Sequence, residues 1–365
     1  MNTKKQHKKI AIICPYPHGI VAGQRFRYEQ YLDFLTNEGY TISIFPFLDE
    51  TTNNKLYNNS KLFFKIFSIL KSLLKRFFLL FSISKYDYLF IYREATLIGP
   101  PFFEFFATKV LKKKIILDFD DAIWKQQTAI NNTFIARLRH SKNKTEKLCS
   151  WAYKVSCGNY FLCDYVKKIN ENTIYIPTTI DTQNLHNQIK THEKKEKTVI
   201  GWTGSFSTMI YLDIVYEIME ELAKKYPIEF HIISNKKPKI NKDFIVYKNW
   251  NKETEIADLM CFDIGIMPLF DTEWEQGKCG FKALQYMALG IPALVSPVGV
   301  NTEIIENNKN GLFATQASEW LEKLSILIES PTYRQQLGKS GRKTIEKRYS
   351  VVSQQKAYLK LFSDI

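Results

Sequence analysis

Short apolar runs alternate with amphipathic segments along most of the chain. Five runs in the first half predict buried strands, at 9–14, 41–47, 88–92, 114–117 and 173–176. The spacing of apolar residues over 27–36 predicts a helix, and a loop with Gly19 and Gly23 precedes it. Strand, glycine-bearing loop, helix and strand form a βαβ unit, which favours a parallel sheet. The pattern therefore predicts an α/β domain over residues 1–185.

The second half repeats this alternation. Apolar runs predict strands at 198–200, 229–233, 244–247, 263–267 and 293–295, with a last strand after Gly311. Predicted helices lie between them at 211–224, 253–260, 281–288 and 301–306. The sequence therefore predicts a second parallel-sheet domain over 195–348. The polar stretch 187–197 is interpreted as the linker between the domains.

Length and charge refine this picture. A chain of 365 residues with 45% hydrophobic residues is long enough for two globular domains. Residues 1–180 hold 27 Lys and Arg against 14 Asp and Glu, a net charge of +13, whereas residues 181–365 hold 24 against 23. A basic half indicates an anionic partner, which is a nucleic acid, an anionic bilayer or a phosphorylated substrate. Interleaved basic and aromatic RNA-binding motifs are absent, so no nucleic-acid partner is expected.

The excess charge follows one aromatic segment, residues 61–84. Polar residues recur there every three or four positions, and all five charged residues are basic. This pattern predicts a cationic amphipathic helix that lies in a membrane interface, and its uncharged stretches fall short of the ~20 residues needed to span a bilayer. The alternative is a helix packed on the sheet. The aromatic cluster at 102–106 and the basic residues 112–114 would extend the same surface.

The start of the chain and the cysteines bear on the compartment. The apolar run 10–14 is too short for the hydrophobic region of a signal peptide. The six cysteines form no CxxC pair and no metal-binding spacing, so we expect reduced thiols. Together with the segment 61–84, these features predict a cytoplasmic protein with peripheral association at the inner face of the cell membrane.

Polar side chains follow three predicted strands of the first domain. In open α/β sheets ligands bind beyond the carboxyl ends of the strands, so these residues are candidates for one site. They are Gln24, Arg25, Arg27, Arg93, Glu94, Asp118, Asp120 and Asp121. The arginines near the first helix either bind an anion or are solvated surface. The three aspartates either bind a divalent metal or pair with Arg93 and Arg25. The first loop lacks G-x-G-x-x-G, so a dinucleotide fingerprint is not supported.

A second set of candidates lies in the second domain. The turn GWTGSFST follows its first strand and precedes a helix, an arrangement suited to a diphosphate. Lys278 and Lys282 are four residues apart and share a helix face. They either neutralise a leaving diphosphate or are solvated surface. The candidate donor-binding residues are Gly204, Ser205, Lys278, Lys282, Gln285 and Glu303.

Several motifs of this chain occur in the same order as in a known protein family. The segment GKCGFKALQYMALGIPALVSPVGVNTEII at 277–305 resembles the donor-binding region of retaining GT-B glycosyltransferases of family 4 and its relatives, where a helix with E-x7-E precedes A-x-G-x-P and G-x-x-E. The segments IGWTGSFST, FDIGIMPL, IYRE, LDFDDAIW and IPTTID resemble one branch of that family. The resemblance covers most of the chain.

The resemblance implies an α/β GT-B fold, with two Rossmann-like domains that face each other across a cleft. The C-terminal domain would hold a nucleotide-sugar, the N-terminal domain a glycan or lipid-linked acceptor, and residues 349–365 would form a helix returning to the first domain. Sugar transfer would proceed with retention, in synthesis of a cell-surface polysaccharide or glycolipid. No cofactor and no metal are expected. A GT-B sugar-nucleotide epimerase and a non-enzymatic nucleic-acid-binding protein are the alternatives.

The chain departs from the family pattern at three places. The two glutamates of E-x7-E fall on Gly277 and Gln285, and Gln285 would contact a ribose hydroxyl as a neutral amide. The Arg and Lys that usually hold the diphosphate are absent from GWTGSFST, so Lys278 and Lys282 are expected to replace them. The acceptor-side histidine is replaced near Arg93 and Glu94. The predicted catalytic residues are Arg25, Glu94 and Lys282.

Overall fold

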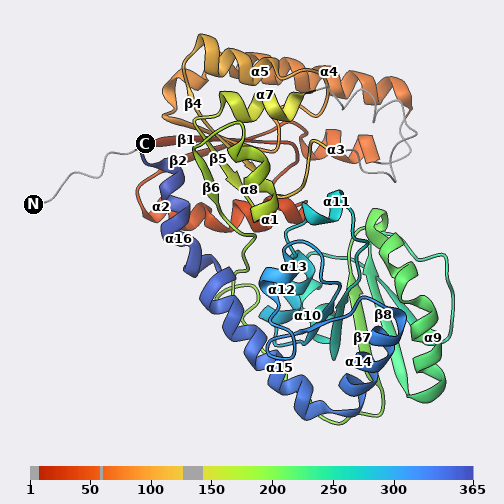
Figure 1. Ribbon diagram of the computed structural model, residues 1–365. Coiled ribbons are helices and arrows are strands. Elements are labelled where there is room, and N and C mark those ends of the chain that lie inside the picture. The colour runs from red at the N-terminus through yellow and green to blue at the C-terminus, as the bar shows by residue number, and fades with distance from the viewer. Residues whose placement is uncertain (1–7, 58–60, 126–142, 365) are drawn as a thin grey trace, which may run out of the picture. The chain divides into compact units, whose positions relative to one another are not determined.

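The computed structural model describes residues 8–57, 61–125 and 143–364. The chain divides into two compact units (Figure 1). Unit 1 comprises Met1–Pro177 together with Gln355–Ile365, and unit 2 comprises Thr178–Gln354. Each unit contains its own six-stranded parallel sheet, which confirms the predicted α/β class with two Rossmann-like domains.

The sheet of unit 1 has the order β2-β1-β3-β4-β5-β6. Its strands are β1 (Lys9–Cys14), β2 (Thr41–Pro46), β3 (Tyr88–Tyr92), β4 (Lys114–Phe119), β5 (Lys154–Cys157) and β6 (Thr173–Tyr175). All of β3 and all but the first residue of β1 are buried, as expected for parallel strands covered on both faces. The apolar pattern does not predict β5, because KVSC is short and begins with a lysine.

Helices connect these strands. They are α1 (Ala22–Arg27), α2 (Leu32–Asn37), α3 (Glu50–Tyr57), α4 (Leu62–Leu79), α5 (Phe102–Phe105), α7 (Lys144–Trp151) and α8 (Tyr160–Lys167). The helix predicted over 27–36 is instead divided into α1, a 3-10 turn at Glu29–Tyr31 and α2. Arg27, Tyr28 and Tyr31 are all buried around this break between α1 and α2.

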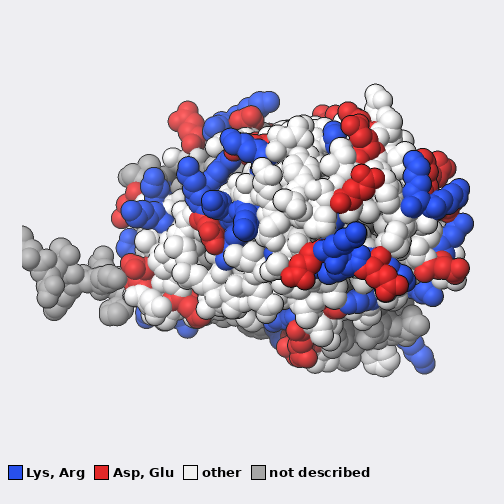
Figure 2. All heavy atoms as spheres, turned by 90° about the horizontal axis from the view of Figure 1, so that it is seen from below, with Lys and Arg blue, Asp and Glu red and all other residues white. Residues whose placement is uncertain are grey.

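The surface charge is mixed where Figure 2 displays it. Lys and Arg side chains lie among Asp and Glu side chains over the face shown. Although the net charge is +14, the basic residues do not form one continuous patch on that face.

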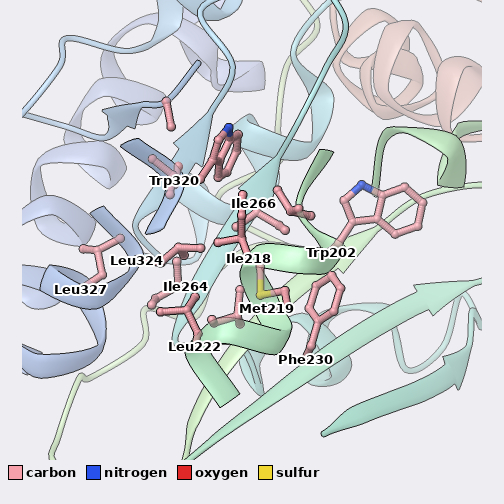
Figure 3. Close-up of a cluster of buried hydrophobic side chains, with 14 of the residues drawn as sticks. Trp202, Ile218, Met219, Leu222, Phe230, Ile264, Ile266, Trp320, Leu324 and Leu327 are labelled. Carbon is pink, nitrogen blue, oxygen red and sulfur yellow. The ribbon is translucent and has the colours of Figure 1, made fainter. Parts of the chain in front are cut away.

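The sheet of unit 2 has the order β9-β8-β7-β10-β11-β12. Its strands are β7 (Thr198–Thr203), β8 (Ile228–Ser234), β9 (Ile245–Asn249), β10 (Ile264–Met267), β11 (Ala293–Val295) and β12 (Leu312–Phe313). Its helices are η5 (Phe206–Ile214), α9 (Tyr216–Lys225), α10 (Glu255–Met260), α11 (Glu273–Gln276), α12 (Phe281–Ala288), α13 (Asn301–Ile304), α14 (Ala317–Glu329) and α15 (Pro331–Thr344). In Figure 3 apolar side chains of the sheet meet those of α9 and α14, with Trp202 and Trp320 both fully buried.

Both strand orders contain a point at which the direction of winding reverses. In unit 2 the order changes between β7 and β10, and in unit 1 between β1 and β3. Ligands of open α/β sheets bind at such a point, beyond the carboxyl ends of the strands. The loops that follow these four strands are therefore the places to look for function.

The polar stretch 187–197 belongs to unit 2 rather than forming an extended linker. Buried Lys190 lies 3.3 Å from the carboxylate of Asp263, and Nε2 of His192 lies 2.9 Å from the carbonyl oxygen of Gly290. Because these polar groups find partners on unit 2, a stretch with linker composition packs as part of a domain.

The chain returns to unit 1 at its C-terminal end. Helix α16 (Val351–Leu359) crosses the unit boundary between 354 and 355, and a 3-10 turn at Lys360–Phe362 follows it. The ring of Tyr358 stacks on that of Tyr31, with centroids 3.9 Å apart. The ammonium of Lys154 donates to the carbonyl oxygens of Lys360 and Ser363. The predicted return of the C-terminal helix to the first domain is confirmed.

Candidate functional site

Tyr286 joins the two central strands of unit 2 at their carboxyl ends. The backbone N–H of Thr203 donates to the Tyr286 hydroxyl at 3.1 Å, and that hydroxyl donates to the carbonyl oxygen of Ile266 at 3.3 Å. Gly265 leaves room for the tyrosine ring, because a Cβ there would lie 2.4 Å from it. Burial raises the pKa of Tyr286, so the phenol stays neutral and keeps its proton to donate.

Lys282 lies one helical turn before Tyr286 and reaches the end of β7. A Cβ on Gly204 would lie 2.9 Å from Cε of Lys282 and 2.6 Å from the Trp202 ring. The Lys282 ammonium is 5.5 Å from the centroid of that ring. A side chain at position 204 would therefore displace the end of the Lys282 chain and the buried Trp202 ring. The structure brings together Gly204 and Lys282, two residues predicted for the donor side.

Lys278 lies in the loop that leads into α12. Its ammonium is 5.7 Å from the Tyr211 ring centroid and 5.6 Å from that of Trp274. Tyr211 belongs to η5, which begins directly after Ser205, and the Ser205 hydroxyl lies 2.9 Å from that of Ser207. Lys278 and Ser205 are thus held at the same end of the sheet as Lys282.

Glu303 lies on the short helix α13, next to the start of α12. A Cβ on Gly280, the residue before α12, would lie 2.3 Å from Ile304, so α13 packs directly against that start. Burial raises the pKa of the half-buried Glu303 carboxyl, and the nearby Arg348 acts in the opposite direction. The structure therefore holds a carboxyl group beside the lysine-bearing loop.

Gln285 is placed differently from the other donor-side candidates. Its side chain is 1% exposed, and its amide donates to the Glu255 carboxylate at the start of α10, at 3.4 Å. Glu255 also accepts from the indole of Trp250. Where the resemblance implies a ribose contact, unit 2 thus has a buried amide and carboxylate pair. The sequence patterns do not point to Glu255, Trp202 or Tyr286, although Lys282 and Tyr286 have the four-residue spacing of one helix face.

Arg27 and Asp118 form a buried ion pair in unit 1. Both side chains are 1% exposed, and Nε of Arg27 donates to the Asp118 carboxylate at 3.1 Å. The same guanidinium donates to the Ser156 hydroxyl and to the carbonyl oxygen of Ile176. The pair therefore connects α1 with β4, β5 and the end of β6. Its burial assigns both residues to the fold rather than to a surface open to an acceptor.

Arg93, which follows β3, contacts the other two aspartates, which follow β4. Its guanidinium donates to Asp120 at 2.9 and 2.6 Å and also contacts Asp121. Asp120 further accepts from the Tyr92 hydroxyl at 2.8 Å. Burial alone would raise the pKa of Asp120, but Arg93 and Arg27 outweigh it and lower that pKa. The carboxylates thus face a guanidinium, and in the part of the chain that the structure describes no cluster of three or more His, Cys, Asp or Glu is arranged to hold a metal ion.

The remaining candidates of unit 1 lie in α1, which follows β1, and on the loop after β3. Gln24 is buried, and its amide exchanges two hydrogen bonds of 3.0 Å with the backbone of Tyr16, which pins the first loop. Arg25 is 7% exposed, beside the ring of Phe26. Glu94 accepts from the ammonium of Lys144 at 2.7 Å. No local sequence pattern predicts this partner, because Lys144 comes from α7, 50 positions away.

The donor-side candidates of unit 2 lie in a segment that matches a known protein family. Residues 197–330 match the family described as "Glycosyl transferases group 1". All six donor-side candidates lie inside this range. Unit 2 contains a group 1 glycosyltransferase domain. The Gly204 and Lys282 contact is thus part of that domain, at the switch point of its sheet. A search of curated proteins finds no sequence that matches the chain.

Similarity to solved structures covers both units and not only the group 1 domain. The chain is similar to the sucrose-phosphate synthase of Thermosynechococcus elongatus (TM-score 0.70, 12% identity, 98% of each chain covered). It is also similar to a glycosyltransferase from Rickettsia africae (TM-score 0.70, 13% identity, 98% of each chain covered). A third neighbour is HepE of Anabaena, solved in complex with UDP and glucose (TM-score 0.63, 11% identity, 98% of this chain and 100% of that chain covered). Both units together therefore have the GT-B fold.

Proposed function

We propose that this protein is a retaining hexosyltransferase. It transfers a sugar from a nucleotide-diphosphate sugar to a hydroxyl group of a glycan or lipid-linked acceptor. The acceptor would belong to a cell-surface polysaccharide or glycolipid, made at the inner face of the cell membrane. The observation that carries the proposal is the passage of the Lys282 chain over Gly204, inside the group 1 domain and beyond the carboxyl end of β7.

The chemistry needed from unit 2 is charge stabilisation. When the sugar leaves its donor, negative charge grows on the departing nucleotide diphosphate, and preorganised cations stabilise that charge. Lys282 and Lys278 are held near the start of α12, where the first backbone N–H groups of a helix also lack intrahelical partners. In the proposed mechanism the acceptor hydroxyl attacks from the face of the sugar that the diphosphate leaves, so the anomeric configuration is retained.

Unit 1 would supply the acceptor side. Arg25 lies in α1, which follows β1, and Glu94 lies on the loop after β3, and the strand order of unit 1 reverses between these two strands. Lys144 neutralises Glu94 in this structure, so Glu94 would act as a positioned hydrogen-bond acceptor rather than as an unpaired base. Arg93, with Asp120 and Asp121, would shape the same rim as an ion-paired cluster.

Substitution of Lys282 tests the donor site. We expect Lys282→Ala to weaken binding of the matching nucleotide-sugar about tenfold and to lower turnover about a hundredfold, since one charge-stabilising group is lost mainly in the transition state. The donor is found first by a thermal-shift screen of UDP-, GDP-, dTDP- and CMP-sugars. Exposed Lys339 on α15 provides the matched control, Lys339→Ala. Equal donor affinity and turnover in Lys282→Ala and wild type would reject the assignment.

The product distinguishes sugar transfer from its rivals. A transferase releases nucleoside diphosphate at a rate that depends on acceptor, and NMR of the product shows the anomeric configuration of the donor. A sugar-nucleotide epimerase instead consumes the nucleotide-sugar without any acceptor. A gel shift at increasing salt tests the nucleic-acid alternative, because binding through phosphates weakens steeply with salt.

A further inference from the structure

Helix α4 exposes most of its apolar residues and buries two serines and an arginine. Ser68, Ser72 and Arg76 are 5%, 3% and 4% exposed, and they recur every four residues along the side that packs on unit 1. The most exposed apolar side chains on the rest of the helix and its end are more than half exposed: Phe63, Phe67, Leu74, Phe78 and Phe81. A surface helix of a soluble domain normally has the opposite arrangement. The apolar face of α4 therefore has no partner within the described part of the chain.

Arg76 explains how this inverted helix is held. Its guanidinium donates to the carbonyl oxygens of Phe45 and Cys14, at the ends of β2 and β1. The guanidinium also lies 5.9 Å from the ring centroid of Phe47 and 5.7 Å from that of Phe103. A buried cation with four such contacts orients the helix, so the phenylalanines are directed outward by the fold.

The exposed face continues onto the neighbouring helix. Figure 1 shows α4 and α5 along the same side of unit 1, and the contact of Arg76 with Phe103 joins them. Phe102 is 65% exposed, and Phe105, Phe106 and Val110 are exposed as well. We call the exposed apolar residues of 63–81 and 102–111 the aromatic face. A contiguous apolar surface of this kind marks an interaction site.

The charged residues exposed on the two segments of the aromatic face are basic, and they include Lys61, Lys71, Lys109 and Lys112. Lys75 of α4 is paired with Asp49 of the preceding segment, at 2.7 Å. Residues 61–84 contain no Asp or Glu, and the one acidic residue of 102–112, Glu104, is buried. A phospholipid bilayer with anionic headgroups complements both the apolar centre and the basic rim.

We propose that the aromatic face docks unit 1 onto an anionic lipid bilayer, with α4 lying in the plane of the interface and its phenylalanines inserted among the acyl chains. No helix in the described ranges is both long and apolar enough to cross a membrane, so the contact is one of insertion from one side. A second copy of the chain fits less well, because a two-fold contact would bring the same basic rim against itself. The inference is independent of the transfer chemistry of unit 2.

Vesicle flotation of the full chain tests the proposal. Wild type is expected to float with vesicles of phosphatidylcholine and phosphatidylglycerol, and less with phosphatidylcholine alone. Phe67→Ser/Phe78→Ser removes two exposed apolar side chains and is expected to weaken binding about tenfold or more. Ile326→Ser/Val352→Ser, which removes two exposed apolar side chains elsewhere, is the matched control and should float like wild type. Nucleotide-sugar binding of both variants is measured in parallel and should be unchanged.

A tryptophan probe separates insertion from adsorption by charge alone. Phe67→Trp places an indole on the aromatic face, and Ile326→Trp places one on α14. Brominated lipids should quench the added fluorescence of Phe67→Trp and leave that of Ile326→Trp unchanged. The proposal is overturned if the Phe67→Ser/Phe78→Ser variant floats like wild type, or if brominated lipids quench both probes alike. It is also overturned if sedimentation shows a lipid-independent dimer that this variant abolishes while wild type does not float.

Discussion

Gly204 and Lys282 show how one missing side chain shapes a site. A Cβ on residue 204 would lie 2.9 Å from Cε of Lys282 and 2.6 Å from the buried Trp202 ring. Only glycine leaves both the lysine chain and the indole in place there, so the lysine passes close to the backbone at the end of β7.

Buried His192 makes the stability of unit 2 depend on pH. Burial lowers the pKa of His192 from its ordinary 6.5 to about 4, although its contact with the Gly290 carbonyl opposes this shift. The unfolded chain binds a proton near pH 6.5 and the folded chain only near pH 4. The stability conferred by neutral His192 is thus present above pH 6.5 and is lost as the pH falls toward 4, by about 3 kcal/mol at most.

Denaturant unfolding at a series of pH values, followed by tryptophan fluorescence, measures this loss. His192→Leu removes the titrating group and should flatten the decline of unfolding free energy between pH 6.5 and 4. A variant whose decline is as steep as that of wild type would show that other groups cause it.

At the scale of elements, polar groups connect helices to strands in unit 1. Arg27 of α1 bonds to β4, β5 and the residue after β6, and Arg76 of α4 bonds to the ends of β1 and β2. Such groups are costly to bury, and the charge-assisted hydrogen bonds to strand carbonyls and to Asp118 offset part of that cost. They determine how each helix is rotated on the sheet, and for α4 this rotation creates the aromatic face.

Removing one member of the buried Arg27–Asp118 ion pair should lower the free energy of unfolding. Asp118→Asn leaves the Arg27 charge without its counter-ion in the core, and we expect it to lower the unfolding free energy by about 3–5 kcal/mol. The exposed pair of Lys114 and Asp364 supplies the control, because Asp364→Asn should change stability by less than about 1 kcal/mol. Urea unfolding of both variants gives the comparison, and similar midpoints would contradict the structural role of Asp118.

At the scale of the whole molecule, the last residues of the chain complete the first unit. Tyr358, Leu361 and Phe362 are buried in unit 1, although about 180 residues of unit 2 separate them from the rest of it along the sequence. The packing of unit 1 therefore includes contacts of long sequence separation, which are slow to form during folding.

Tyr358→Ala measures this dependence. The substitution removes a stacked, fully buried ring, and we expect a loss of about 3–5 kcal/mol in the unfolding free energy. Lys356→Ala, an exposed change two residues earlier, should leave stability within about 0.5 kcal/mol. If the urea midpoints of the two variants agree, the C-terminal segment contributes little to unit 1.

The amino-acid sequence by itself determined the class of fold and the places where chemistry is possible. Apolar strands, helical spacing and glycine turns are patterns within a few residues, so β1, β3, β10 and the glycine-flanked start of α12 follow from them directly. The resemblance in motif order carried the GT-B expectation and the return of the last helix.

Tertiary structure alone decided which polar side chains are free to act. Arg27 pairs with Asp118 across 91 positions, Gln285 with Glu255 across 30, and Glu94 with Lys144 across 50. It also decided that the serines and the arginine of α4 face inward while its phenylalanines face outward. Local periodicity shows that a helix has two faces, whereas the choice of buried face depends on the hydrogen-bond partners that distant strands present to it.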